Sequence, residues 1–104
     1  MRRGEVWWVD FPPPIGRRPA VLVSRNQAYQ IRASITVVPV TRKVRGIPVE
    51  VGLGPADGIP RKSVANADSI MTVPKDRLVG YLTALSPEKV EAVGRAIKFA
   101  LDLP

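Results

Sequence analysis

Arg18 and Thr41 are the two side chains whose types and positions best suit chemistry on a phosphate group. Arg18 stands directly before Pro19, at the start of a β-forming run, and Thr41 ends another such run, residues 34–41. Antiparallel pairing of the two runs would bring these ends together with only a modest register offset between the strands. A guanidinium fork and a hydroxyl suit a phosphodiester whose charge rises in a pentavalent transition state. The same pair could instead hold a nucleic-acid backbone without cutting it.

Composition narrows the chemistry that is available. The 104 residues include no Cys and no His, which excludes disulfides, thiol catalysis and the usual zinc sites. The glycine-rich phosphate-binding motifs of nucleotide-hydrolysing folds are also missing. Hydrolytic chemistry would therefore depend on carboxylates, hydroxyls and guanidinium groups, and we expect neither a metal nor another cofactor.

The surplus of positive charge is concentrated in one segment. The chain has 16 basic and 9 acidic residues, and residues 11–49 contain seven of the basic ones and no Asp or Glu. The remainder of the chain is therefore neutral. A local positive field attracts polyanions, which favours a nucleic acid as the partner over a merely solvated basic face. The seven residues are Arg17, Arg18, Arg25, Arg32, Arg42, Lys43 and Arg45.

Short β-forming runs and one clear helix must position these residues. Strands are predicted for residues 4–11, 20–24, 34–41, 47–51 and 78–85, and residues 63–73 are typical of one bent strand or two short ones, with Asp68 and Ser69 near the bend. The internal Pro39 indicates a strand edge or bulge. A short helical turn fits residues 27–30. The pattern predicts a mainly β, α+β fold built on a small, strongly bent antiparallel sheet.

The last part of the chain has a helical pattern. Ser86 is a good N-cap and Pro87 suits the first helical position. Val90, Val93, Ile97 and Leu101 then recur at helical spacing. With 45% hydrophobic residues, the chain has room for one domain, 1–104. It shows neither a signal-peptide pattern nor a membrane-spanning stretch, so we expect it in the cytoplasm.

Trp7 and Trp8 could stack on unpaired bases. Neighbouring strand residues point to opposite faces, so at most one of the two can enter a given site. We expect Trp8 to pack in the core, whereas for Trp7 the two roles are about equally supported.

Three N-terminal blocks together resemble the signature of the MazF/PemK toxin endoribonucleases. The blocks are RGEVWWVD at residues 3–10, GRRPAVLVSRN at 16–26 and ITVVPVT at 35–41, and residues 63–78 are similar to a later block that ends in Arg77-Leu78. The resemblance covers nearly the whole chain in order and spacing. It implies a small SH3-like, PemK-like antiparallel β-barrel with a C-terminal helix, and a homodimer.

The resemblance also implies an activity, which is sequence-specific, metal-independent cleavage of single-stranded RNA such as mRNA. The ribose 2′-OH would attack the adjacent phosphorus and leave a 2′,3′-cyclic phosphate and a 5′-OH. Arg18 matches the family's catalytic arginine and Thr41 its catalytic Thr or Ser. Because a guanidinium has a pKa above about 12, we expect Arg18 to act electrostatically before it acts as an acid or base. The protein would be a growth-inhibiting toxin, bound by an antitoxin with an acidic, disordered tail.

The candidate RNA-binding residues come from the basic segment and from the later block. They are Arg17, Arg25, Asn26, Arg42, Lys43, Arg45, Asp68 and Ser69. The loop at residues 12–17 is shorter than in the family, and Asp68-Ser69 replaces an acidic residue followed by Gln, so the cut sequence does not carry over. The alternative is a non-catalytic nucleic-acid- or protein-binding module on the same barrel, such as an inactive MazF-like protein or a gyrase-inhibitor-like toxin.

Overall fold

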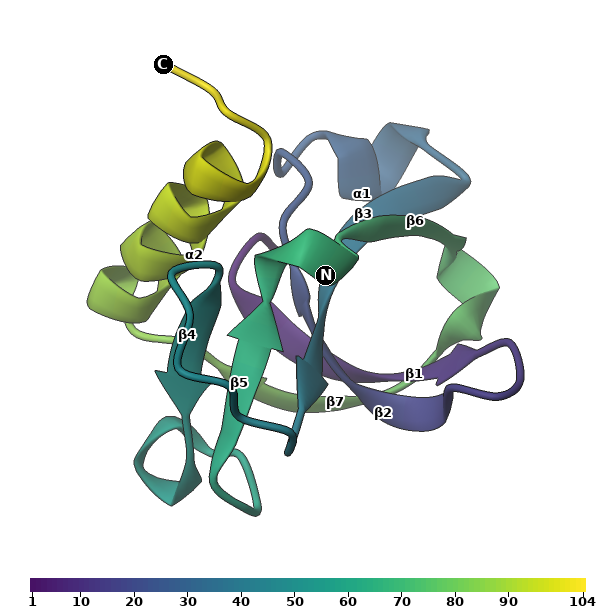
Figure 1. Cartoon of the computed structure of the whole chain (residues 1–104). Coiled ribbons are helices and arrows are strands. Elements are labelled where there is room, and N and C mark those ends of the chain that lie inside the picture. The colour runs from purple at the N-terminus through teal and green to yellow at the C-terminus, as the bar shows by residue number, and fades with distance from the viewer.

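The computed structural model describes residues 1–104, in which a bent seven-stranded sheet packs against a C-terminal helix (Figure 1). The strands are β1 (Glu5–Phe11), β2 (Gly16–Leu22), β3 (Ser34–Thr41), β4 (Glu50–Leu53), β5 (Ser63–Asn66), β6 (Met71–Pro74) and β7 (Leu78–Ala84). The helices are α1 (Ala28–Ile31) and α2 (Pro87–Ala100), with 3-10 turns η1 (Pro55–Asp57), η2 (Ala67–Ser69) and η3 (Lys75–Arg77). The predicted mainly β fold with a C-terminal helix is confirmed.

β3 is the strand around which the sheet bends. The strand order is β4-β5-β3-β2-β1-β7, and all pairs are antiparallel. On the edge of β3 away from β2, β6 pairs with Ser34–Val37 and β5 pairs with Val40 and Thr41. Pro39 lies between these two partners, where a missing N–H interrupts neither ladder. The predicted irregularity at Pro39 is therefore a change of partner strand.

Two strand boundaries differ from the prediction. β2 begins at Gly16 instead of residue 20, because β1 pairs with it as far as Phe11 and Gly16. β4 begins at Glu50 instead of residue 47. The Glu50 carboxylate accepts hydrogen bonds from the backbone N–H groups of Arg45 at 3.1 Å and Gly46 at 2.8 Å. These bonds shape the loop before β4, so the strand starts only after it.

The other predicted elements are present. Residues 63–73 form two short strands, β5 and β6, and η2 with Asp68 and Ser69 lies between them. The helical turn predicted at residues 27–30 is α1, one residue further along. At the start of α2, the Ser86 hydroxyl accepts a hydrogen bond from the Lys89 N–H at 3.3 Å, which confirms the N-cap. Neither helix is long and apolar enough to cross a membrane.

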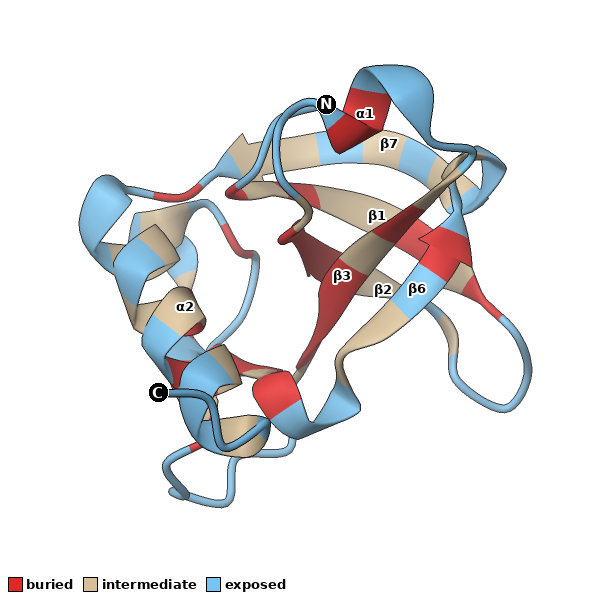
Figure 2. Cartoon of the chain, turned by 90° about the horizontal axis from the view of Figure 1, so that it is seen from above, coloured by how far each residue is buried: buried red, intermediate tan, exposed pale blue.

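Two apolar clusters hold the sheet in its bent shape. Figure 2 shows buried residues along β1 and β3 and exposed residues on the outer side of α2. The cluster that includes α2 contains Val6, Val21, Val38, Val40, Ile59, Val93 and Ala96. The other contains Val9, Phe11, Leu22, Tyr29, Ile35 and Val37. Each of β1, β2 and β3 therefore sends alternate residues to different clusters, as expected for a sheet buried on both faces.

α1 closes one end of the second cluster through Tyr29. Its side chain is buried, and its hydroxyl donates a hydrogen bond to the Ser24 carbonyl oxygen at 3.0 Å. Burial raises the pKa of Tyr29 to about 12 because the ionised phenolate loses hydration inside the protein.

Candidate active site

A pocket of about 530 Å³ opens where the middle of β1, the start of β2 and the end of β3 meet the loop before β5. Apolar and basic side chains share its lining. The apolar ones are Trp8, Pro19, Val40, Ile59 and Pro60. The basic ones are Arg17, Arg18, Arg42, Lys43 and Arg61, and two hydroxyl residues, Thr41 and Ser63, complete the lining. An apolar surface with cations around it suits a ligand that has both rings and phosphates.

Arg18 and Thr41 reach this pocket because of the register between β2 and β3. The last paired residues are Ala20 and Pro39. Continued two residues beyond this pair, the same antiparallel register places Arg18 opposite Thr41, on one face of the sheet. Both side chains line the pocket, as the predicted pairing of the two strands requires.

The adjacent arginines Arg17 and Arg18 have different environments. Arg17 lies opposite Asp10 in the β1–β2 pair, and its Nε donates to Asp10 Oδ1 at 2.8 Å while its Nη2 lies 3.3 Å from Oδ2. This bond lowers the pKa of Asp10 and raises that of Arg17. Arg18 forms no ion pair, and the one hydrogen bond of its side chain is a long one of 3.4 Å to the Ile15 carbonyl oxygen. The charge of Arg18 is therefore available to a phosphate.

A hydrogen bond from the backbone holds the hydroxyl of Thr41 in position. Thr41 Oγ1 accepts a hydrogen bond from the backbone N–H of Lys43 at 3.2 Å. A hydroxyl that accepts one bond keeps its own hydrogen free to donate. Thr41 also pairs with Val64 of β5, so its backbone belongs to the sheet. This geometry points to a preorganised donor on a rigid strand end.

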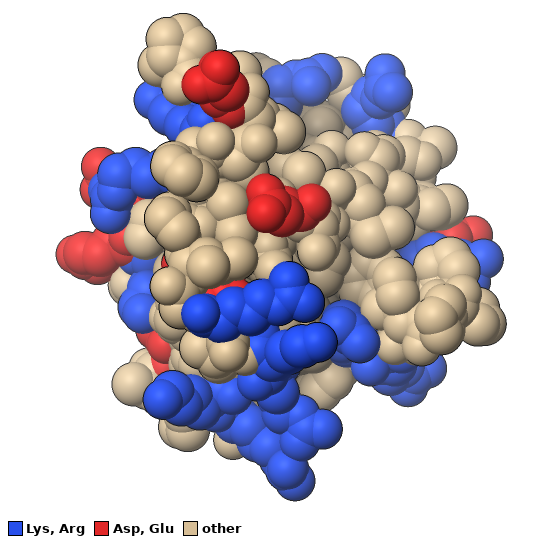
Figure 3. Space-filling model, in the orientation of Figure 1, with Lys and Arg blue, Asp and Glu red and all other residues tan.

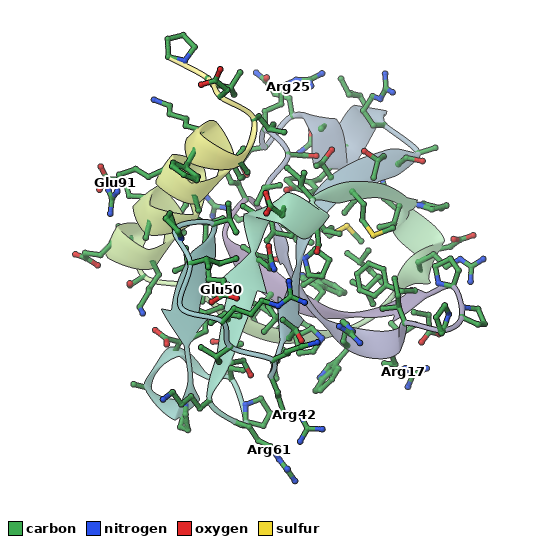
Figure 4. All side chains as sticks on the ribbon, in the orientation of Figure 1. Arg17, Arg25, Arg42, Glu50, Arg61 and Glu91 are labelled. Carbon is green, nitrogen blue, oxygen red and sulfur yellow. The ribbon has the colours of Figure 1, made fainter.

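Four cations of the pocket have no acidic partner. They are Arg18, Arg42, Lys43 and Arg61, since the chain's side-chain ion pairs involve only Arg17 and Lys89. Figure 3 shows Lys and Arg side chains gathered at the lower end of the molecule, and Figure 4 places Arg42 and Arg61 there, extending away from the sheet. Arg45 follows in the same loop, with its backbone N–H bound to Glu50. Arg45 lies outside the pocket lining, and the four unpaired cations of the lining form one cationic surface.

Sequence reasoning missed Arg61. The acid-free basic segment ends before Glu50, the first acidic residue after Asp10, so Arg61 lies outside that segment. Antiparallel pairing of β5 with β3 returns the chain to Thr41, so the residues just before β5 lie at the pocket. The basic pair Arg61-Lys62 in a Gly- and Pro-rich loop was the signal that could have indicated it.

Five predicted RNA-binding residues do not line the pocket: Arg25, Asn26, Arg45, Asp68 and Ser69. Arg25 and Asn26 precede α1, and Figure 4 shows Arg25 at the end of the molecule opposite Arg42. Asn26 Oδ1 accepts a hydrogen bond from the Arg3 N–H at 2.7 Å, so it ties down the N-terminus. Asp68 and Ser69 are exposed on η2. The structure thus divides the predicted set, and contacts of these five residues with RNA stay predictions.

The prediction for Trp8 is wrong, because Trp8 lines the pocket instead of packing in the core. Trp7 packs against the core cluster of Val9 and Phe11. Its Nε1 donates to Glu5 Oε1 at 2.9 Å, and its ring meets Tyr81 edge-on with centroids 6.0 Å apart. Alternation along the strand separates the two indoles as predicted, but the bend of the sheet decides which face opens to solvent.

Comparisons with known proteins identify the family of the chain. Residues 2–101 match the family of the PemK-like, MazF-like toxin of type II toxin-antitoxin systems. Probable endoribonuclease MazF5 of Mycobacterium tuberculosis is 41% identical, with 96% of this chain and 92% of the relative covered. Endoribonuclease MazF1 of Mycobacterium bovis is 35% identical, with 98% and 93% covered. 

A solved structure described as an endoribonuclease in complex with its cognate antitoxin from Mycobacterial species is similar over the whole fold. It is 35% identical, with a TM-score of 0.88 and coverage of 100% of this chain and 97% of the other. Mycobacterium tuberculosis toxin MazF-mt6 also has a TM-score of 0.88, at 26% identity and coverage of 96% and 98%. This chain therefore belongs to the PemK-like, MazF-like toxin family of type II toxin-antitoxin systems.

Proposed function

We propose that this chain is a sequence-specific, metal-independent endoribonuclease that cleaves single-stranded RNA. The observation that carries the proposal is the convergence of the unpaired Arg18 and the hydroxyl of Thr41 in one cation-lined pocket. The endoribonuclease names of relatives that cover nearly the whole chain support the reaction type.

The RNA itself supplies the nucleophile in the proposed reaction. The ribose 2′-oxygen attacks the adjacent phosphorus, so the O2′–P bond forms while the P–O5′ bond breaks. The 2′-OH loses one proton and the departing 5′-oxygen gains one, which leaves a 2′,3′-cyclic phosphate and a 5′-OH. No water is consumed, and the chain's lack of His and Cys is compatible with this chemistry.

Arg18 and Thr41 stabilise the pentavalent transition state. Its nonbridging oxygens carry more negative charge than those of the starting phosphodiester, so donors aimed at them favour the transition state over the bound substrate. Thr41 donates its free O–H, and Arg18 contributes its unpaired charge and remaining N–H groups. One preorganised donor of this kind contributes about 3 kcal/mol.

The other unpaired cations hold the strand. Arg42, Lys43 and Arg61 surround the reacting pair and bind phosphates on either side of the cut. We further propose that the chain is a toxin that inhibits growth in the cytoplasm until an antitoxin binds. The family and the structural neighbour with its cognate antitoxin support this role. An acidic antitoxin tail would occupy the same cationic surface.

A homodimer is the proposed assembly. β7 is an edge strand of the sheet, and its Val79 and Tyr81 are 45% and 55% exposed. An exposed apolar edge strand is a liability that a second copy can cover.

Cleavage of a long single-stranded RNA by purified protein in EDTA tests the proposal. We expect fragments with 2′,3′-cyclic phosphate and 5′-OH ends, and a 2′-deoxynucleotide at a mapped cut should abolish that cut alone. Arg18→Ala and Thr41→Ala should each lose cleavage and keep the oligomeric state of the wild type. RNA that stays intact at every protein concentration would reject the enzyme. If the protein still binds that intact RNA, the alternative of a non-catalytic nucleic-acid-binding module on the same barrel is favoured.

A further inference from the structure

We infer that Trp8 is the platform of a nucleobase-binding subsite, on which one unstacked base next to the scissile phosphate lies against the indole. The inference rests on the proposed function. It assigns the apolar side of the pocket to the base of the bound RNA. It makes Trp8 a substrate-binding residue for the cleavage reaction.

Position in the sheet brings Trp8 next to the proposed chemistry. Trp8 pairs with Pro19 in the β1–β2 register, and Pro19 directly follows Arg18. The same pocket is lined by Pro19, Val40 and Ile59, none of which carries a polar side-chain group. A phosphate bound by Arg18 would therefore have its neighbouring nucleoside beside an apolar surface. Bases bind such surfaces through their faces, and every base has one.

Trp8 is half-buried, and its two neighbours across the sheet have little side chain with which to cover its ring. They are Pro19 on β2 and Gly80 on β7. A Cβ added at Gly80 would lie 3.9 Å from Trp8 Cδ1, so the absence of a side chain there keeps that edge of the indole free. Trp7 has the opposite environment, because its β7 neighbour is Tyr81, whose ring packs against it.

The indole N–H of Trp8 is also free. It makes no hydrogen bond within the chain, whereas the N–H of Trp7 is bound to Glu5. No buried side-chain nitrogen or oxygen lacks a partner in this structure, so the Trp8 N–H is not fully buried. A half-buried indole with an unpaired N–H that lines a pocket can stack on a base and also donate to a carbonyl or phosphate oxygen.

The chain's two tryptophans make a matched pair for the test. Trp7→Phe leaves Trp8 as the only indole, and Trp8→Phe leaves only Trp7. The probe is a short single-stranded RNA of mixed sequence with 2′-O-methyl riboses throughout, which binds without being cut. Its binding is measured by the anisotropy of a terminal dye, and tryptophan emission is recorded in the same titration.

We expect saturating RNA to quench the emission of Trp7→Phe strongly and that of Trp8→Phe weakly. A sugar-phosphate oligomer without bases should leave the emission of Trp7→Phe unchanged. Trp8→Ala should weaken RNA binding by about 5- to 150-fold, and Trp8→Phe should keep most of the affinity because its ring still stacks.

Each outcome decides between the two proposals. RNA binding without quenching of Trp8, or equal quenching of both indoles, overturns the subsite and leaves the endoribonuclease intact. Strong Trp8 quenching with no cleavage of unmodified RNA supports the subsite and rejects the enzyme. No RNA binding by any variant or by the wild type overturns both.

Discussion

Replacing Thr41 by valine removes one hydrogen-bond donor from the candidate active site and keeps the size of the side chain. Thr41 Oγ1 is held by the Lys43 N–H at 3.2 Å, so the donor is already oriented before RNA binds. Loss of one such donor at a developing oxyanion lowers the rate of the chemical step by about 100- to 1,000-fold. The Lys43 N–H is exposed and turns to water in the variant. We therefore expect a loss of stability of at most about 1 kcal/mol.

Single-turnover cleavage measures this effect. An RNA oligomer with one mapped cut is mixed with excess protein in EDTA, at concentrations that saturate binding, so that the rate constant reports the chemical step. Thr41→Ser keeps the donor and should stay within about tenfold of the wild type. Thermal denaturation checks that both variants are folded. A Thr41→Val rate within about threefold of the wild type, or an equally slow Thr41→Ser, would refute the assigned role.

Three further predictions concern RNA binding and stability. With four unpaired pocket cations on phosphates, raising the salt from about 50 to about 200 mM should weaken binding of single-stranded RNA about 50-fold in an anisotropy titration, and a flat response would contradict this. Gly58 has φ +85°, and an added Cβ would lie 2.7 Å from Thr83 Cβ, so Gly58→Ala should cost about 2 kcal/mol or more in chemical denaturation. Because burial raises the pKa of Tyr29 from 10.0 to about 12, its contribution to stability is complete below about pH 10 and is lost as the pH rises to about 12. Tyr29→Phe should reduce that alkaline decline in the denaturation midpoint, and an unchanged decline would contradict the assignment.

The elements that the sequence predicted well are those with strong local signals. The N-cap Ser86 and Pro87 marked the start of α2 to the residue, since capping depends on the first turn alone. The β-forming pattern of residues 34–41 matches β3 in full, although it contains Pro39. The early start of β2 was missed because Gly16, Arg17, Arg18 and Pro19 have weak β preference, and pairing with β1 holds them extended.

The residues of the candidate site also divide into those with a local sequence signal and those placed by strand pairing. Arg18 and Thr41 were identified from their chemistry, from their places at strand ends and from the family resemblance. Arg61 was not, because its place at the pocket depends on the pairing of β5 with β3. Arg25 belongs to the same acid-free segment as Arg42, yet the two lie at opposite ends of the molecule (Figure 4). Closeness in sequence therefore grouped charges that the fold separates.

The sequence by itself determined the chemistry available to this protein: a local excess of positive charge, no His or Cys, and an Arg and a Thr at the ends of two β-forming runs. Alternation along β1 also separated Trp7 from Trp8. Only the tertiary structure decided which indole reaches the pocket, which of the cations surround Thr41, and that Asp10 neutralises Arg17 and leaves Arg18 free. The physical reason is that side-chain chemistry and strand alternation are local properties. Register, partner strands and the bend of the sheet arise from contacts between residues far apart in the chain.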